Sequence, residues 1–253
     1  MNKLKNKTVT LALGGGSVLG ATHVGVLKAL EESNAEIKAI SGTSAGGIVA
    51  TLYAFGKSAK EIEKIILKFE WKNLSSLTLS KFGLLSNEKI GEMIKHNIGD
   101  KNIEEALIPL CMIATDITTG EKVLLSKGNV AEAVMATTSV PGIFVPVEIE
   151  GRILVDGGIV ENIPLSCLKS YQVDYKIGVD LVTTQSYRKP RNVIEILYNS
   201  FNFLVKTNKK IQTKEADILI KPDLSKFNAI DMSQMKELIK IGYDETRKII
   251  KNL

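Results

Sequence analysis

The stretch Gly42-Thr43-Ser44-Ala45-Gly46 decides the fold, because it joins two runs of different character. The apolar run Ile37–Ile40 before it is typical of a buried strand, and Gly47–Phe55 after it is compatible with a helix. A Gly-x-Ser-x-Gly pattern between a strand and a helix predicts a nucleophile elbow, whose two glycines leave room for the neighbouring elements. A Ser/Gly-rich helix N-cap is the alternative, so the pentapeptide alone leaves the role of Ser44 open.

The composition is that of a globular protein. The chain has 253 residues, of which 44% are hydrophobic and 24% are charged. Strand-like and helix-like segments alternate, with no internal repeat, low-complexity linker or domain boundary between them. This alternation predicts an α/β fold with a mainly parallel central sheet. Local signals predict a capping box at Ser58-Ala59-Lys60-Glu61, a helix cap at Ser86, a helix over Val130–Thr138 and a tight hairpin turn at Glu150-Gly151. We expect a single domain over residues 1–253, with the motifs in 8–164 and further strand and helices in 165–253.

Charge and cysteine content restrict the expected surroundings. The net charge of +5 is mild and spread along the chain, so it does not indicate nucleic acid, but it favours anionic surfaces such as acidic lipid headgroups. Cys111 and Cys167 lie in apolar stretches and are typical of buried thiols in a reducing compartment. No run reaches the ~20 apolar residues of a membrane-spanning helix. We therefore expect a cytoplasmic protein that can contact a membrane peripherally.

A second motif is the glycine-rich loop Gly14-Gly15-Gly16-Ser17-Val18-Leu19-Gly20, between a predicted strand, Thr8–Leu13, and a predicted helix, Ala21–Glu32. Main-chain N–H groups in such a loop can face a negative charge, and the helix dipole adds to their effect. The glycine spacing fits neither frame of a dinucleotide fingerprint, and no Gly-Lys-Ser/Thr follows, which excludes a Walker loop. An oxyanion-binding or phosphate-binding loop remains, beside a purely structural turn.

Histidine is poorly placed to serve Ser44 as a base. The chain has two histidines, His23 and His96, and neither follows Asp156 or any later acid. An α/β hydrolase with a triad has the order serine, acid, histidine. His23 is typical of a helix residue that packs locally, and His96 of an exposed helix end. The pattern therefore favours a base other than histidine.

The best candidate for that base is Asp156, in Leu154-Val155-Asp156-Gly157-Gly158. It ends an apolar strand, and the two glycines after it leave the carboxylate uncovered. An aspartate has an ordinary pKa of about 3.9, so burial must raise its pKa if it is to act near neutral pH. An Asp-Gly hairpin turn is the alternative. A calcium loop is excluded, because only Glu161 is near as a further acidic ligand.

Four blocks, in one order across residues 8–164, resemble the patatin-like phospholipases. Thr10–Leu27 is similar to the family's oxyanion-hole block, Ser41–Gly47 to its nucleophile block, Ala136–Val147 to its third block, and Asp156–Pro164 to its catalytic-aspartate block. Two positions differ. Leu19 stands where the family usually has arginine or lysine, and Ser17 where it often has a further glycine.

The resemblance implies a three-layer α/β/α sandwich that acts on acyl esters of lipids without a metal or cofactor. By this match Ser44 is the nucleophile and Asp156 is the base of a Ser–Asp dyad. The N–H groups of Gly15 and Gly16, together with Ser17 or Gly14, would form the oxyanion hole. The elbow would contain Gly42 and Gly46, and the aspartate turn Gly157 and Gly158. An acyltransferase and a non-catalytic lipid-binding homologue are the alternatives.

Two apolar segments have open roles. A helix is predicted over Val193–Lys206 or beyond, and basic residues lie around both of its ends: Arg188, Lys189 and Arg191 before it, and Lys206, Lys209 and Lys210 at its end. Its aromatic and aliphatic side chains could contact an anionic membrane, or they could face the core with only the helix ends solvated. Trp71, with Leu74 and Leu77, could belong to a lid or to the core.

Overall fold

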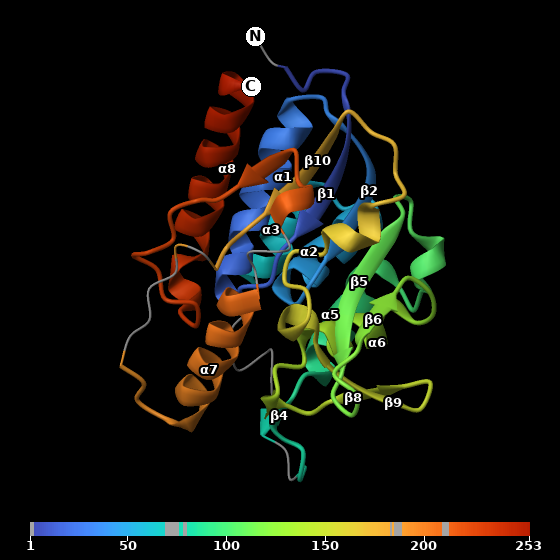
Figure 1. The fold of residues 1–253 in the computed structure, drawn as a ribbon, viewed down its shortest axis with the longest axis vertical. Helices are drawn as coiled ribbons and strands as arrows, with labels where there is room; N and C mark the ends of the chain where they lie inside the picture. Colours follow the sequence, from blue (N-terminus) through green and yellow to red (C-terminus); the bar gives the residue numbers. More distant parts are fainter. Residues whose placement is uncertain (1–2, 69–75, 78–79, 183, 185–188, 209–212) are drawn as a thin grey trace.

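The computed structural model describes residues 3–68, 76–77, 80–182, 184, 189–208 and 213–253, so the question about Trp71 and Leu74 lies outside the described residues. Within them, eight strands form one sheet in the order β11-β10-β1-β2-β5-β9-β8, with β6 paired to β5 (Figure 1). Their bounds are β1 Thr8–Leu13, β2 Glu36–Gly42, β5 Leu110–Asp116, β6 Lys122–Leu125, β8 Val147–Ile149, β9 Arg152–Asp156, β10 Tyr175–Val179 and β11 Ile218–Ile220.

The sheet is parallel from β11 to β5 and antiparallel beyond it. β5 pairs antiparallel with β6 and with β9, and β9 with β8. The predicted hairpin turn between β8 and β9 is confirmed, because Glu150 and Gly151 both have positive φ, 52° and 74°, as a type I′ turn requires. The predicted α/β fold with a mainly parallel sheet is also confirmed.

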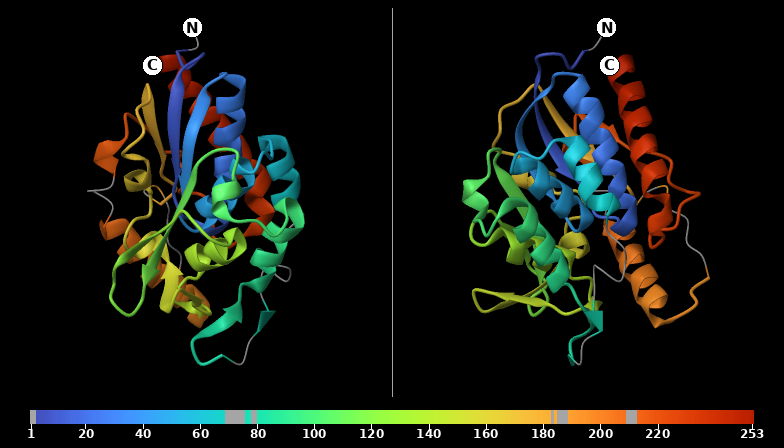
Figure 2. Two further views of the ribbon diagram at one scale, coloured as in Figure 1. Left: turned by 90° about the vertical axis from the view of Figure 1, so that its right-hand side faces the viewer. Right: turned by 180° about the vertical axis from the view of Figure 1, so that it is seen from behind.

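Helices cover the sheet unequally. Figure 2 shows α1 and α8 side by side on one face of the sheet, where Leu11 and Leu13 of β1 enter the main core. On the other face, Ala12 packs against Leu165 and Leu168 of the short helix η4. The three-layer sandwich is therefore confirmed, with η4 in its thinner outer layer. The helices are α1 Thr22–Glu32, α2 Ala45–Ala54, α3 Ala59–Leu67, α5 Glu88–Ile98, α6 Val130–Thr138, α7 Val193–Asn208 and α8 Met235–Asn252, and the short ones are η1 Ser17–Ala21, η2 Ile103–Glu105, η3 Gly157–Ile159, η4 Leu165–Leu168 and η6 Met232–Gln234.

Two helix starts show how local signals act. The capping box predicted at Ser58 is present, with the Glu61 N–H donating to the Ser58 hydroxyl at 3.3 Å. The prediction that Ser86 caps the next helix is wrong by one residue, since Asn87 is the N-cap of α5. Ser86 instead ends strand β4 (Gly83–Ser86), and its hydroxyl accepts from the Glu88 N–H at 3.2 Å. This strand pairs with β3 (Ser76–Leu77) and β7 (Gly142–Phe144) in a small second sheet that the sequence did not predict.

Helices α1 and α8 touch through their backbones. A Cβ atom at Gly25 would overlap the carbonyl of Ile239, and one at Gly242 would overlap the carbonyl of Thr22. Only glycine allows so close an approach. At this crossing α8, which lies beyond the motif-bearing residues 8–164, packs directly on α1, the helix that follows the glycine loop. Among the described helices, none is long and apolar enough to cross a bilayer.

Candidate active site

Ser44 lies at the turn between β2 and α2. Its φ of 54° and ψ of −127° belong to a region that residues with a side chain rarely adopt. A Cβ at Gly42 would overlap the backbone of Gly46, and one at Gly46 would overlap the carbonyl of Leu13. The strand–turn–helix setting expected for this pentapeptide is therefore present, and the crowding explains why it needs both glycines.

Thr137 of α6 fixes the backbone of this turn. Its Oγ1 accepts a hydrogen bond from the Ser44 N–H at 3.0 Å and donates one to the carbonyl of Ile113 at 2.5 Å. Sequence reasoning did not single out Thr137. The sequence feature that could have identified it is a hydroxyl on the buried face of a helix, because a buried hydroxyl needs a hydrogen-bond partner.

Asp156 ends β9 and is fully buried. Its Oδ1 accepts a hydrogen bond from the Gly158 N–H at 2.8 Å. The preceding strand brings it close to β5, since a Cβ at Gly157 would overlap the carbonyl of Ile113. The turn predicted to present this carboxyl is thus packed tightly, and the carboxyl faces the interior.

Burial raises the pKa of Asp156 to about 7, while the Ser44 hydroxyl and the Gly158 N–H act to lower it. Oδ2 nevertheless makes no hydrogen bond of ordinary length within the described part of the chain. The effect on the pKa requires the Ser44 hydroxyl to lie close to the Asp156 carboxyl. Hydrogen bonds of catalytic groups are often long before a substrate binds. The structure thus brings the two predicted dyad residues together.

The glycine loop divides its N–H groups between two tasks. The Gly14 N–H donates to the Val179 carbonyl at 3.1 Å, and the Gly15 N–H donates to the Asn162 carbonyl at 3.3 Å. The N–H groups of Gly16 and Ser17, in the first turn of η1, make no hydrogen bond to any described residue. Of the four candidates for an oxyanion hole, these two are available to a ligand and the other two hold the loop in place.

His23 supports the loop from behind. Its buried Nε2 lies 2.7 Å from the Gly14 carbonyl, and its Nδ1 makes no hydrogen bond with the described residues. Burial lowers the pKa of His23 to about 4, against a smaller opposing effect of the Gly14 carbonyl. The imidazole is therefore neutral at pH 7 and donates from Nε2, so it orients the loop and does not serve as a base for Ser44.

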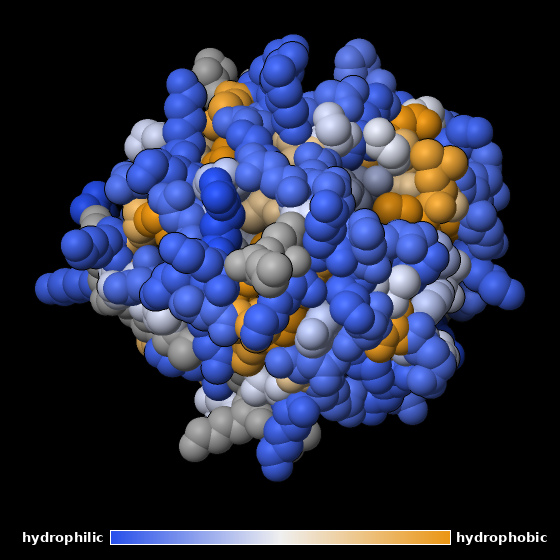
Figure 3. All heavy atoms as spheres, turned by 90° about the horizontal axis from the view of Figure 1, so that it is seen from above, coloured by the Kyte–Doolittle hydropathy of each residue, from blue (hydrophilic) through white to orange (hydrophobic). Residues whose placement is uncertain are grey.

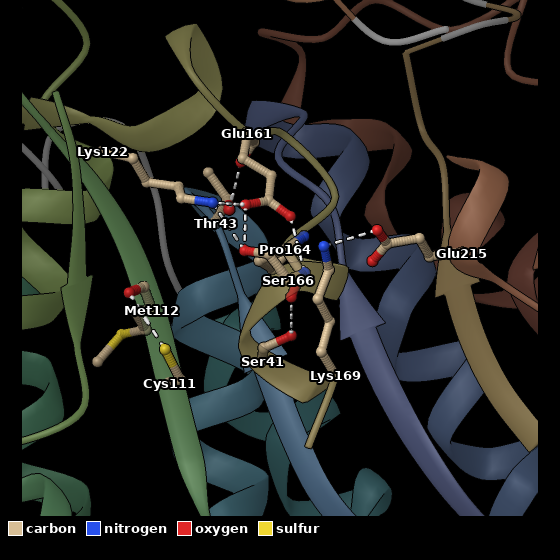
Figure 4. Close-up of polar contacts among 10 residues, drawn as sticks. All are labelled: Ser41, Thr43, Cys111, Met112, Lys122, Glu161, Pro164, Ser166, Lys169 and Glu215. Atoms are coloured by element: carbon tan, nitrogen blue, oxygen red, sulfur yellow. Dashed lines mark hydrogen bonds and ion pairs between the residues drawn. The ribbon is translucent and has the colours of Figure 1, made fainter. Parts of the chain in front are cut away.

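An ionic cluster, in which Glu161 is buried and Lys122 is exposed, joins the loop after Asp156 to the elbow (Figure 4). The Thr43 hydroxyl donates to the main-chain carbonyl of Glu161 at 3.0 Å, and the Glu161 N–H donates to the Gly157 carbonyl at 2.8 Å. The Glu161 carboxylate accepts from Lys122 Nζ and from the Ser166 N–H, each at 2.9 Å. Glu161, rejected above as a calcium ligand, therefore anchors this loop, and Lys122 and Ser166 are functional candidates that the sequence did not reveal.

Two cavities meet at Ser44. The larger, about 150 Å³, is almost wholly apolar and extends over α2, α5 and α6. Its walls include Ile48, Val49, Met93, Val140, Phe144 and Met235. Apolar cavities of roughly this size stay dry and bind a benzene-sized group. The smaller, about 20 Å³, lies against the glycine loop and is closed by Tyr198, Phe201 and Asn202 of α7. The Ser44 hydroxyl thus lies between an apolar cavity and a small recess lined by main-chain donors.

Comparison with known sequences identifies relatives of this chain. Residues 11–168 match the family described as patatin-like phospholipase. An uncharacterized NTE family protein of Mycobacterium tuberculosis is 34% identical over 180 residues, which are 68% of this chain and 49% of that protein. The lysophospholipase NTE1 of Saccharomyces cerevisiae is 26% identical over 283 residues, which cover 99% of this chain and 17% of that protein. The chain thus spans about half the length of its mycobacterial relative.

Solved structures share the fold. VipD from Legionella pneumophila superposes with a TM-score of 0.65 at 15% identity, covering 98% of this chain and 67% of that one. ExoU, in its complex with SpcU from the type III secretion system of Pseudomonas aeruginosa, gives a TM-score of 0.53 at 14% identity, covering 98% and 52%. At these identities the similarity concerns architecture alone.

Proposed function

The chain belongs to the patatin-like phospholipase family, and from this premise we propose that it is a serine hydrolase of lipid acyl esters. The observation that carries the proposal is the pairing of Ser44 with Asp156, a buried carboxyl whose pKa of about 7 suits proton transfer near neutral pH. The hydroxyl is held on a strained turn, beside two main-chain N–H groups without other partners.

In the first half of the proposed reaction, Asp156 takes the proton of the Ser44 hydroxyl as Oγ attacks the ester carbonyl carbon. The electron pair of the carbonyl moves to its oxygen, and the N–H groups of Gly16 and Ser17 bind this oxyanion. One such donor is worth about 10²–10³ in rate in other hydrolases. The intermediate then expels the lipid alcohol, which takes the proton from Asp156 and leaves an acyl-enzyme on Ser44.

In the second half, water attacks the acyl carbon while Asp156 takes one of its protons. The same two N–H groups hold the second oxyanion. Its collapse breaks the bond to Oγ, which recovers its proton from Asp156, and a fatty acid leaves. No group other than the dyad is needed to balance the protons. An alcohol in place of water would give acyl transfer by the same steps.

The apolar cavity supports a lipid acyl chain as the group transferred, and we infer that the substrate is a phospholipid or lysophospholipid. The name of the yeast relative, a lysophospholipase, agrees with this substrate class. We also infer that the protein works in the cytoplasm, peripheral to a membrane. Its two cysteines, Cys111 and Cys167, are half-buried and not fully buried as expected, but both are free thiols, as a reducing compartment favours.

Labelling with a fluorophosphonate probe tests the nucleophile. We expect the wild type and Ser200→Ala, a control at an exposed serine of α7, to be labelled equally, and Ser44→Ala to be unlabelled. Purified protein should hydrolyse nitrophenyl esters of graded chain length and lysophosphatidylcholine. Labelling that persists in folded Ser44→Ala, or a wild type that turns over none of these esters, would overturn the proposal. Adding glycerol as an acceptor distinguishes hydrolysis from transfer, because only transfer yields glyceryl esters.

A further inference from the structure

Helix α7 is apolar on both of its faces. On one face, Tyr198 and Val205 are buried. On the opposite face, four large apolar side chains are exposed: Val193 by 57%, Ile196 by 52%, Phe203 by 51% and Leu204 by 56%. We call these four residues the outer stripe.

The outer stripe contains no charge. Between its members lie Ser200 and Thr207, which complete the i, i+4, i+7, i+11 spacing from Ile196. The exposed face of a helix in a globular protein normally carries charged and polar residues. A continuous exposed apolar patch is instead typical of a surface that meets a partner or a membrane.

The opposite face of the same helix closes the catalytic recess. Tyr198, Phe201 and Asn202 line the small cavity together with Ser44. Phe201 also lies over the aspartate turn, since a Cβ at Gly158 would come within 3.0 Å of its ring. Whatever contacts the outer stripe is therefore separated from Ser44 by the thickness of one helix.

The position of α7 at one end of the molecule agrees with docking through that end. Figures 1 and 2 place α7 and β4 at the end opposite the two termini. Two further apolar side chains are exposed near β4: Phe82 by 73% and Leu84 by 40%. The other end, seen in Figure 3, is mostly hydrophilic, with apolar side chains only in separate small areas. Exposed apolar residues thus occur on α7 and at β4, which share this end.

The charges around the outer stripe favour a lipid surface over a second copy of the chain as its partner. Exposed Lys189 and Arg191 precede the helix and Lys206 lies near its end, while Glu195, its one acid, lies off the stripe. In a two-fold dimer built on this stripe, either direction of the helix pair would bring basic ends together. An apolar stripe with basic ends on a protein of net charge +5 instead complements anionic headgroups.

We propose that the outer stripe of α7 docks on an anionic lipid surface and delivers acyl esters from that surface to Ser44. The inference rests on the proposed function, because the docked lipid is the substrate of the dyad. It assigns α7 two roles, one on each face: binding to the bilayer outside and closure of the recess inside.

The test compares two double variants with the same charge change. Ile196→Glu/Leu204→Glu alters the stripe, and Leu107→Glu/Leu124→Glu alters side chains that are 77% and 53% exposed on other elements. Binding is measured by flotation with phosphatidylglycerol–phosphatidylcholine vesicles. Turnover is measured on the vesicle lipid and on nitrophenyl butyrate in solution, and self-association by sedimentation.

We expect the stripe variant to lose at least about ten-fold in vesicle binding and in the ratio of vesicle to soluble-ester turnover, and the control to keep both. Equal binding by the two variants would overturn the inference, as would a wild type that turns over the soluble ester but does not bind anionic vesicles. A wild-type dimer that only the stripe variant dissociates, with vesicle binding unchanged, would assign the stripe to a second copy. A wild type that binds vesicles through the stripe but hydrolyses neither ester would reject the proposed function alone.

Discussion

The Thr43 hydroxyl donates a hydrogen bond to the main-chain carbonyl of Glu161 at 3.0 Å, and this bond ties the nucleophile's turn to the loop that carries the base. Thr43 directly precedes Ser44, and Glu161 follows Asp156 by five residues. The distance between the two dyad residues therefore depends on a contact that neither of them makes.

Replacing Thr43 tests this dependence. Thr43→Val keeps the shape but leaves the Glu161 carbonyl without its donor, which costs about 1–3 kcal/mol in a buried site and loosens the loop. We expect kcat on a soluble ester to fall roughly ten-fold with little change in KM, because small displacements of catalytic groups are costly. Thr43→Ser keeps the hydroxyl and should retain most activity. Equal kcat in the wild type and Thr43→Val would show that the contact does not position the dyad.

The pH dependence of activity should follow Asp156. The base must be deprotonated to accept the Ser44 proton, and its pKa is about 7 because of burial. We expect kcat/KM on an uncharged ester to rise with pH and to level off above about 7. Asp156→Asn should lower kcat by about 10²–10⁴-fold. A wild-type profile that is flat between pH 5 and 8 would contradict the assignment of the base.

The same pKa predicts a gain in stability for Asp156→Asn at higher pH. In the unfolded chain the carboxyl ionises near its ordinary value of 3.8, and in the folded protein only near 7. Between these values the unfolded chain loses the proton first, so wild-type stability falls as pH rises and stays lowered above 7. Chemical denaturation at several pH values should show the asparagine variant gaining on the wild type from pH 4 to 7. A constant difference across this range would argue against the raised pKa.

His23 should change the pH dependence of stability in the opposite direction. Burial lowers its pKa from 6.5 to about 4, so on acidification the unfolded chain takes up the proton first. Its contribution to stability is complete above pH 6.5 and is lost as pH falls toward 4. His23→Gln does not titrate, and its amide can still donate to the Gly14 carbonyl. We expect its melting temperature to fall less steeply than that of the wild type between pH 6.5 and 4; parallel curves would contradict a neutral buried imidazole.

Ser17→Gly separates the main chain of the glycine loop from its side chain. Ser17 has a φ of 53°, which glycine adopts without strain, and the substitution keeps the N–H. We expect activity within about two-fold of the wild type, since the proposed oxyanion contact is made by the N–H. A large loss of kcat with an unchanged fold, measured by circular dichroism, would instead assign a role to the hydroxyl.

Features with local signals could be predicted from the sequence. The capping box at Ser58, helix Val130–Thr138 and the Glu150-Gly151 turn depend on residues a few positions apart, and the structure contains all three. The alternation of elements predicted the α/β fold for the same reason. That the whole chain forms a single domain stays a prediction.

Features decided by distant partners could not be predicted. Which N–H groups of the glycine loop stay without a partner depends on the carbonyls of Asn162 and Val179, more than a hundred residues away. Thr137 became relevant only when folding placed α6 against the elbow. The anchor of Glu161 likewise needs Lys122, from a hairpin whose sequence has no motif. The candidate catalytic residues could be identified from the sequence, but the residues that hold them in position could not.

The contact of Gly25 with α8 has a consequence for how related sequences can vary. Gly25 lies inside the part that matches the family, residues 11–168, and Gly242 lies outside it. The outer surface of α8 can therefore diverge freely, while its crossing point must stay small as long as α1 keeps its glycine. Among relatives that share Gly25, we expect one invariantly small position in an otherwise variable C-terminal helix, and this position would mark where the helix crosses α1.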